Sequence, residues 1–328
     1  MKNKKSRLTV KSMKIVILDK KTVTNGDISF DDIYALGDVT EYDTTAPEQL
    51  IERISGADAV ICNKVVIDSD AMDACPELRY IGLFATGYNN IDITAAERHG
   101  ITVCNVPAYS TSSVAQQVFA YILHFTNKTA EYSRMVSEGA WISSDTFSCF
   151  PLPLNELAGQ TLGITGFGSI GKAVARIALA FGMKVLVYTR TPKQYEGVAF
   201  VSFDELLSRS DFITLHCPLT DATRGLITLE QLKKCKSTAV LINTSRGPVV
   251  NETDLRKALD EGIIAGAAVD VLEHEPMLDS CPLLGADNCI ITPHIAWAPY
   301  QTRVRLIGIV AENLKKFIDS TPQNVVKE

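Results

Sequence analysis

The chain has 328 residues, of which 46% are hydrophobic and 21% are charged, and its formal net charge is −6. This length favours two domains, since single hydrophobic cores stop growing at about 250 to 300 residues, and the composition is that of an ordinary soluble globular protein. The acidic balance argues against an exposed nucleic-acid-binding surface, although it is compatible with a local basic pocket for a phosphate.

The N-terminus is basic but lacks the continuous apolar stretch of about 7 to 15 residues that a signal peptide needs. We interpret residues 1–12 as an extension or tag and Met13 as a natural start. The eight cysteines are scattered, without a CxxC pair, which is typical of reduced thiols in a cytoplasmic protein. The uncharged stretch 101–127 is rich in Ser, Thr, Asn and Gln, so it is not expected to span a membrane.

Short apolar runs alternate with amphipathic stretches along the whole chain, a pattern typical of parallel strands with crossover helices. A first series of four strands is predicted, with helices between them, and a long helix follows at 112–127. The predicted strands of this series are 14–19, 58–62, 80–84 and 101–105, and the helical candidates between them include 47–55 and 72–78.

A second series of strands begins at 161–166 and ends near His294, and a last helix is predicted at 303–318. No predicted strand follows that helix, so we expect it to pack on the elements of the first series. The sequence therefore predicts an α/β protein of two Rossmann-like, doubly wound parallel-sheet lobes with a cleft between them. The predicted domains are a discontinuous substrate domain of 1–110 and 300–328, and a dinucleotide-binding domain of 111–299. The later predicted strands of the second series are 184–188, 212–216, 238–243, 265–270 and 289–293.

A glycine-rich loop, TGFGSIGK, follows the first strand of the second series and opens an apolar-periodic helix. Strand, GxGxxG loop, helix and second strand within about 30 residues are a specific signal for dinucleotide binding. The first glycine permits the tight turn, the second lets the backbone approach a pyrophosphate, and the third lets the helix pack on its strand. The candidate contacts of this loop are Gly166, Phe167, Gly168, Ser169, Ile170 and Gly171.

The second strand of this unit ends in the sequence VYTRTP, where NAD sites commonly place an acid that binds the adenosine ribose. Thr189 stands at that position, so a 2′-phosphate would meet no like charge. Arg190, Thr191 and Lys193 could donate hydrogen bonds to it. The sequence therefore predicts a preference for NADP over NAD; the alternative is that Arg190 is a solvated arginine that stacks on adenine while NAD binds.

Three charged residues follow late strands of the second series, namely Arg246, Glu275 and His294. The carboxyl ends of parallel strands share one sheet edge, where ligands bind. An arginine can bind a carboxylate in two-point geometry, and a carboxylate beside a histidine favours its protonated form. These residue types provide the anchor, the orienting group and the proton donor that reduction of a 2-oxo acid by hydride needs.

Each of these residues also has an ordinary structural interpretation. Arg246 could form an interdomain salt bridge, Glu275 could be a loop residue before Pro276, and His294 could be a core histidine. Their joint placement at one sheet edge favours the chemical interpretation. The EHE tripeptide at 273–275 has no helical ligand spacing, so no metal site is predicted.

Several stretches carry a resemblance to a known family, over nearly the whole chain. The sequence resembles the D-isomer-specific 2-hydroxyacid dehydrogenases and is most similar to their glycerate dehydrogenase and hydroxypyruvate reductase branch. The stretches are ATGYNNID (85–92), NVPAYSTSSVAQ (105–116), ELAGQTLGITGFGSIG (156–171), LHCPLTDATRGLI (215–227), NTSRGPVV (243–250), AAVDVLEHEP (267–276) and TPHIAWAP (292–299).

The resemblance implies a catalytic triad of Arg246, Glu275 and His294, and a homodimer in which the long helix starting near Ser112 is the dimerisation and hinge element. Trp297 could cap the substrate pocket or be an aromatic of the lobe interface. The resemblance also implies that Asp270 contacts the nicotinamide amide, that Ser169 and Ile170 lie against the pyrophosphate, that Cys217, Pro218, Thr244 and Ser245 line the cofactor cleft, and that the backbone of Ala85, Thr86 and Gly87 binds the substrate carboxylate.

Thr189 and Gln117 depart from the family pattern, the latter standing where many relatives of this branch have histidine. We expect a cytoplasmic NAD(P)-dependent oxidoreductase that acts on the CH–OH group and reduces hydroxypyruvate- or glyoxylate-type 2-oxo acids to D-hydroxy acids. Its only partners would be the small acid and a second copy of the chain, with no nucleic acid or membrane. The alternatives are a D-lactate-type dehydrogenase and a dinucleotide-sensing binding protein like the transcriptional corepressors of this fold.

Overall fold

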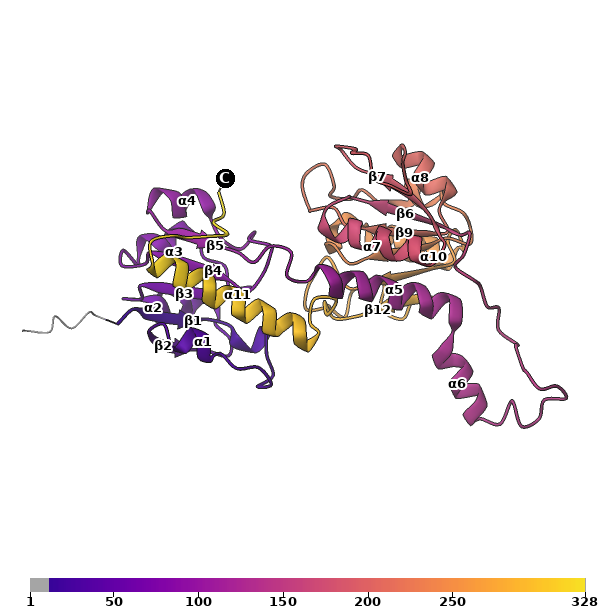
Figure 1. The fold of residues 1–328 in the computed structure, drawn as a ribbon, viewed down its shortest axis with the longest axis horizontal. Helices are drawn as coiled ribbons and strands as arrows, with labels where there is room; N and C mark the ends of the chain where they lie inside the picture. The colour runs from indigo at the N-terminus through magenta and orange to yellow at the C-terminus, as the bar shows by residue number, and fades with distance from the viewer. Residues whose placement is uncertain (1–11, 328) are drawn as a thin grey trace, which may run out of the picture. The chain divides into compact units, whose positions relative to one another are not determined.

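A computed structural model describes residues 12–327, so residues 1–11 of the predicted extension lie outside the described part of the chain. The chain divides into two compact units. Unit 1 comprises the described residues up to Tyr109 and those from Ala298 onward, and unit 2 comprises Ser110–Trp297 (Figure 1). No helix within residues 12–327 is long and apolar enough to cross a membrane.

Unit 1 is built on a sheet of five parallel strands in the order β2-β1-β3-β4-β5. Every residue of β3 and β4 is buried, because helices cover both faces of the sheet. The strands are β1 (Lys14–Ile17), β2 (Asp38–Glu41), β3 (Ala59–Cys62), β4 (Tyr80–Leu83) and β5 (Thr102–Cys104). The helices are η1 (Lys20–Thr22), α1 (Asp31–Tyr34), η2 (Pro47–Gln49), α2 (Leu50–Ile54), α3 (Ser69–Asp73), α4 (Ile93–Arg98) and α11 (Tyr300–Ile318).

The last helix, α11, packs on α1 and β4 of unit 1 (Figure 1). Its C-terminal end is fixed by Phe317, whose ring lies 4.9 Å from the ring of the buried Tyr80. Polar contacts add to this packing, since the Asn313 side chain donates to the Asn105 carbonyl at 2.9 Å. Helix α11 therefore packs into the core of unit 1.

Unit 2 is built on a sheet of seven parallel strands in the order β12-β11-β10-β9-β6-β7-β8. Both sheets are parallel throughout, so the predicted two-lobe α/β fold is confirmed. The strands are β6 (Thr161–Thr165), β7 (Lys184–Tyr188), β8 (Val198–Phe200), β9 (Phe212–Leu215), β10 (Val240–Asn243), β11 (Gly266–Val269) and β12 (Cys289–Ile291). The helices are α5 (Thr111–Asn127), α6 (Thr129–Ser137), α7 (Ser169–Ala180), α8 (Phe203–Arg209), α9 (Leu229–Leu232), η3 (Gly247–Val249) and α10 (Glu252–Asp260).

The helix that follows the glycine loop lies close to its own strand because glycine leaves room for it. A methyl group at Gly171 would overlap the Gly166 carbonyl, and one at Gly163 would overlap the Ser210 hydroxyl on the other face of β6. Helix α7 in turn packs against α5, and their apolar side chains form one core with β6 and β7. The position of the glycine loop is therefore set by close packing on both faces of β6.

A few sequence predictions need correction. The helix predicted at 72–78 lies instead at Ser69–Asp73, because the Asp68 side chain caps it and Pro76 disfavours helical backbone in the residue before it. The edge strands β2 and β8 were not predicted, since neither contains a buried residue and both lack the apolar run of a central strand.

Candidate active site

The candidate site residues of unit 2 follow the ends of its parallel strands, so they share the carboxyl edge of one sheet. The strand order reverses at β6, which has β7 on one side and β9 on the other. The glycine loop leaves β6 at this switch point, where doubly wound sheets bind their ligands. The carboxyl edge of unit 2 is therefore the place to test for a dinucleotide site.

The geometry of the glycine loop suits a pyrophosphate. Gly166 has a φ of +92°, which favours glycine, and a methyl group there would lie 2.7 Å from the His216 carbonyl. At Gly168, by contrast, an added methyl group would meet nothing within 4 Å. Gly168 is also the N-cap of α7 and offers no side chain to its first N–H groups. These donors face open space at the positive end of a helix dipole, where a phosphate can bind.

Two hydroxyl groups beside this loop also point to a ligand. Within residues 12–327, the Oγ1 atoms of Thr165 and Thr244 are buried without a hydrogen-bond partner. Buried polar groups are rarely left unpaired unless a water or a ligand satisfies them. Ser245, in contrast, uses its hydroxyl to donate to Asn243 Oδ1 at 2.9 Å. The residues at the ends of β6 and β10 therefore fit a polar cofactor.

The sequence that follows β7 lies next to the glycine loop, because Gly166 donates its N–H to the Tyr188 carbonyl at 2.9 Å. Thr189 is half-buried, and Arg190 and Thr191 are exposed. The chain then turns back, and the Tyr195 ring meets the ring of Phe167 edge-on at 5.1 Å. The segment that carries Arg190 is thus held against the glycine loop by the contact between the Tyr195 and Phe167 rings.

His294 and Glu275 form a pair. His294 Nδ1 lies 2.7 Å from Glu275 Oε2, and the other carboxylate oxygen accepts the Leu272 N–H at 3.1 Å. A carboxylate at Nδ1 assigns the proton of that nitrogen to this bond. The atom left for a proton exchange is therefore Nε2, and the side chain of His294 is only 28% exposed.

His294 adopts a φ of 54°, in the left-handed region that non-glycine residues seldom occupy. The backbone bond from His294 N to the Asp270 carbonyl, 2.8 Å long, fixes it in this conformation. Backbone strain of this kind persists only where the surrounding structure over-determines it, and it is frequent at functional sites. The conformation of His294 therefore supports a chemical role over that of an ordinary core histidine.

The buried carboxylate of Asp270 organises the loop that carries His294. Its Oδ1 accepts the Ile295 N–H at 2.9 Å and its Oδ2 accepts the Ala296 N–H at 2.8 Å. The Thr292 hydroxyl also donates to Oδ1, at 2.5 Å, and itself contacts the Tyr121 hydroxyl of α5. The sequence singled out Asp270 as a candidate cofactor contact. Its bonds to the loop of His294, and the contacts of Thr292 and Tyr121 with it, correspond to no sequence motif and could not be predicted.

Arg246 is half-buried and follows β10, the neighbour of the strand that precedes Asp270. Its Nη1 donates to the Ser245 carbonyl at 2.7 Å. The next residue, Gly247, packs directly on the chain before Glu275, because a methyl group there would overlap the Leu272 carbonyl. The segments that carry Arg246 and Glu275 are therefore in backbone contact.

The predicted substrate loop, Ala85 to Gly87, belongs to unit 1 and follows β4. The Thr86 hydroxyl donates to the Val106 carbonyl at 2.6 Å, and Val106 N donates to the Ala85 carbonyl at 2.9 Å. These bonds fix the loop at the carboxyl end of its strand. Trp297 is half-buried at the end of unit 2.

Cys217 is half-buried after β9, and burial raises the pKa of its thiol, which makes it a poor nucleophile. Pro218, next to it, is exposed and its carbonyl accepts a hydrogen bond from the Thr223 hydroxyl at 2.6 Å. All eight cysteines are free thiols. Across residues 12–327, no group of three or more His, Cys, Asp or Glu side chains could hold a metal ion.

The fold and this edge define a dinucleotide-dependent dehydrogenase of the doubly wound class. The family model for the D-isomer specific 2-hydroxyacid dehydrogenase NAD binding domain matches residues 119–296. The chain belongs to the D-isomer specific 2-hydroxyacid dehydrogenase family. It is an oxidoreductase that uses a nicotinamide dinucleotide and acts on the CH–OH group of its donor, so the enzyme prediction is confirmed over that of a binding protein.

Individual relatives agree with this assignment. The chain is 42% identical to a hydroxypyruvate reductase of Blautia hydrogenotrophica, covering 96% of this chain and 100% of the relative. It is 39% identical to a glycerate dehydrogenase of Methylorubrum extorquens, covering 96% and 99%. Among solved structures, an acyclic imino acid reductase in complex with NADPH and D-Arg is 30% identical, with a TM-score of 0.85 over 96% of this chain and 100% of that one.

His216 follows β9, supports the glycine loop and is not part of the His294–Glu275 pair. Its Nε2 lies 2.9 Å from the Thr214 hydroxyl, and its Nδ1 is buried without a hydrogen-bond partner in the described structure. The residue as a whole is half-buried, but its ring nitrogens are shielded from water. This burial lowers the pKa of His216 to about 3, so the ring is neutral in the folded protein.

The buried neutral ring predicts a pH-dependent stability. Because the pKa of His216 falls from about 6.5 in the unfolded chain to about 3 in the folded one, its contribution is complete above about pH 6.5 and is lost as the pH falls towards 3. We expect His216→Gln to flatten the fall in unfolding free energy between pH 7.5 and 5, by up to ~1.4 kcal/mol per pH unit.

Urea unfolding followed by tryptophan fluorescence measures this slope, because both tryptophans, Trp141 and Trp297, belong to unit 2. The control is His124→Gln, which replaces a half-exposed histidine of α5 in the same unit. Equal slopes for wild type and His216→Gln would show that His216 carries no proton-linked stability.

Proposed function

We propose that this enzyme reduces hydroxypyruvate, glyoxylate or a similar small 2-oxo acid to the D-hydroxy acid, with His294 as proton donor. The observation that carries the proposal is the 2.7 Å contact between His294 Nδ1 and Glu275 Oε2, at the same sheet edge as the glycine loop. The names of the hydroxypyruvate reductase and glycerate dehydrogenase relatives support this substrate class.

The roles of the three charged residues follow from their chemistry. Glu275 accepts the hydrogen bond of His294 Nδ1 and orients the ring, so that Nε2 can give a proton to the carbonyl oxygen of the acid. Arg246 binds the substrate carboxylate and polarises the carbonyl. A bound nicotinamide dinucleotide supplies the hydride, or accepts it when the hydroxy acid is oxidised. Nε2 would then accept the hydroxyl proton.

Two groups of residues are assigned to the substrate carboxylate. One is the side chain of Arg246, and the other is the set of backbone N–H groups of Ala85, Thr86 and Gly87. The bonds of this loop to Val106 support the assignment, since a fixed backbone offers its N–H groups without an entropic cost of ordering. Trp297 is assigned to the substrate pocket, where an indole ring would exclude water.

The dinucleotide is assigned to the glycine loop, the end of β7 and the residues after β9, β10 and β11. NADP is the preferred cofactor in this proposal, because Arg190 and Thr191 are exposed and the sequence 189–195 contains no acid. The assigned residues are Gly166, Phe167, Gly168, Ser169, Ile170, Gly171, Thr189, Arg190, Thr191, Cys217, Pro218, Thr244, Ser245 and Asp270.

The protein is further proposed to be a homodimer. The resemblance assigns the dimer contact to α5, and we extend this contact to an arm that follows α5 and comprises α6 and the segment 138–156. Helix α6 and the loop after it extend away from the sheet of unit 2 (Figure 1). The side chains of Ile142 and Phe147 are 90% and 91% exposed, and Trp141 and Phe150 are also largely exposed. Apolar surface of this extent is typical of a protein interface. A cytoplasmic location, supported by the eight free thiols, completes the proposal.

Removal of the proton donor should abolish most of the activity. We expect His294→Ala to lower kcat for hydroxypyruvate reduction by about 10²- to 10⁴-fold. The control is His99→Ala, which replaces a histidine of unit 1 after α4 that pairs with Asp73. Initial rates followed by nicotinamide absorbance, with hydroxypyruvate, glyoxylate and pyruvate in parallel, measure the effect. Near-normal turnover of His294→Ala would remove it from the mechanism, and a clear preference for pyruvate would favour a D-lactate-type dehydrogenase.

The nucleotide preference should depend on Arg190. We expect a lower KM for NADPH than for NADH in the wild type, and loss of that difference in Arg190→Ala, because a charge-assisted bond to the 2′-phosphate contributes about 1.5 to 3 kcal/mol. The matched control is Arg209→Ala, which removes an exposed arginine of α8 paired with Glu205. Equal use of NADH by the wild type, unchanged in Arg190→Ala, would reject the NADP assignment.

The oligomeric state should depend on the arm. We expect the wild type to sediment as a dimer and the double variant Ile142→Glu, Phe147→Glu to sediment as a monomer, since two carboxylates cannot be buried in an apolar interface without a large cost. The control is Ile51→Glu, a similar change at an exposed isoleucine of α2. A wild type that sediments as a monomer, or a dimer that survives both changes, would disprove the role of the arm.

A further inference from the structure

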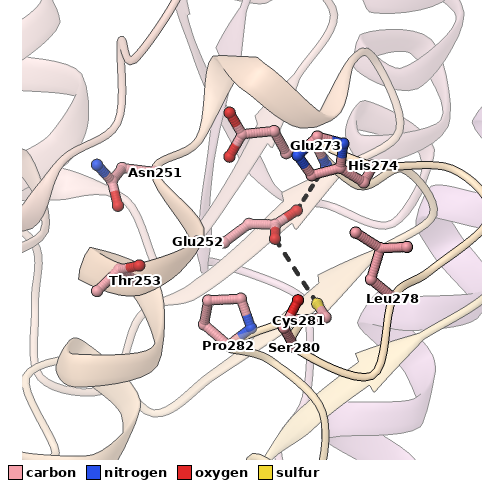
Figure 2. Close-up of a pocket in the computed structure, with 9 residues that line it drawn as sticks. All are labelled: Asn251, Glu252, Thr253, Glu273, His274, Leu278, Ser280, Cys281 and Pro282. Carbon is pink, nitrogen blue, oxygen red and sulfur yellow. Dashed lines mark hydrogen bonds between the residues drawn. The ribbon is translucent and has the colours of Figure 1, made fainter.

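A hollow of about 180 Å³ lies on unit 2 beside the loop that carries Glu275 (Figure 2). It is formed by the start of α10 and by two loop segments, 273–274 and 278–282. One carboxylate in it, that of Glu252, is buried, with 8% of the residue exposed, and has no part in the chemistry proposed above. A buried carboxylate is costly unless charge-assisted bonds offset its desolvation, so its partners show what it does for the fold.

Glu252 binds both ends of one loop. Its Oε1 accepts the Glu273 N–H at 2.6 Å, and the Cys281 thiol donates to its Oε2 at 3.6 Å, as the dashed lines in Figure 2 show. Glu252 itself is fixed, because it is the first residue of α10, whose N-cap Asn251 accepts the Asp254 N–H. A negative charge at this helix end is also stabilised by the helix dipole. The carboxylate therefore anchors the loop to a rigid helix.

The same loop carries the orienting carboxylate of the proposed mechanism. Near Glu275, Gly247, next to Arg246, packs on the Leu272 carbonyl, and Glu275 Oε1 accepts the Leu272 N–H. The bond from Glu273 N to Glu252 fixes Glu273, which connects Leu272 to the remainder of the loop. With this bond in place, the path from α10 to Glu275 Oε2 and His294 Nδ1 has little freedom to relax.

We propose that Glu252 is a positioning residue of the reaction, which holds the loop 272–275 so that Glu275 meets His294. The inference rests on the proposed function of that pair. Glu252 touches no reacting atom and acts through Glu275. Its loss leaves the Glu273 N–H without its acceptor and allows the loop to shift, and a displacement of about 1 Å at a catalytic group can cost about 100-fold in rate.

The first test separates positioning from stability. We expect Glu252→Ala to lower kcat by about 10- to 100-fold with the KM for NADPH within about twofold of the wild type, because the glycine loop belongs to a different strand and helix. Glu252→Gln, which keeps an oxygen acceptor for Glu273 N, should recover most of the turnover. The matched control is Asp254→Ala: Asp254 lies in the first turn of the same helix and accepts the Leu229 N–H at 3.0 Å, away from the loop.

Asp254→Ala should lower the unfolding free energy without this loss of kcat. If both alanine variants lose kcat in proportion to their loss of stability, Glu252 is a structural residue only. If Glu252→Gln is as impaired as Glu252→Ala, the acceptor role is wrong.

A double-mutant cycle with Glu275→Gln then tests whether Glu252 acts through Glu275. If it does, Glu252→Ala costs much less in the Glu275→Gln background than in the wild type, since the interaction that it supports is already lost. Fully additive losses would overturn the proposal. Failure of the proposed function and failure of the positioning role give different results. Wild-type turnover in Glu275→Gln overturns the proposed function. An impaired Glu275→Gln together with an unimpaired Glu252→Ala overturns only the positioning role of Glu252.

Discussion

The buried carboxylate of Asp270 is the constraint on which the candidate site depends. It follows β11 and accepts two backbone N–H groups and one hydroxyl from the loop after β12. Charge-assisted bonds of this kind are about twice as strong as neutral ones, and together they hold His294 in its left-handed conformation. The left-handed conformation of His294 is sustained by these three bonds to its neighbours together with the bond from His294 N to the Asp270 carbonyl.

Two carboxylates thus contact the two loops that carry His294 and Glu275. Asp270 binds the loop of His294, and Glu252 binds the loop of Glu275. Both carboxylates are buried; Asp270 accepts two backbone N–H groups and Glu252 accepts one, so that both bind the main chain of these loops. The 2.7 Å contact between the two loops is therefore the result of two independent anchors in neighbouring parts of one sheet. Such support by surrounding groups gives a site its precision.

Much of this architecture could be predicted from the sequence, because strands buried on both faces leave continuous apolar runs. The runs that became β9 and β10 are entirely buried, and the glycine pattern located the switch point of the sheet. The edge strands β2 and β8 could not be found in this way, since neither contains a fully buried residue.

The residues that support the site were harder to predict than those proposed to do the chemistry. Glu252 reads as an ordinary acid in the first turn of a helix, a position that favours acids whatever lies nearby. Its partner is a backbone N–H of the loop after β11, and backbone partners leave no trace in residue type. Asp270 was recognised through its family role, yet its bonds to residues 295 and 296 depend on how two loops meet.

The order of the strands separates the residues proposed for nucleotide recognition from those proposed for acid–base chemistry. The segment with Arg190 follows β7, on one side of β6, whereas Arg246, Glu275 and His294 follow β10, β11 and β12 on the other side. The Phe167 ring ties the Arg190 segment to the glycine loop through Tyr195. If the proposed function holds, the end of β7 selects the dinucleotide and the loops after β11 and β12 carry the proton transfer. The two tasks would then rest on loops on opposite sides of β6, so that a change in one need not disturb the other.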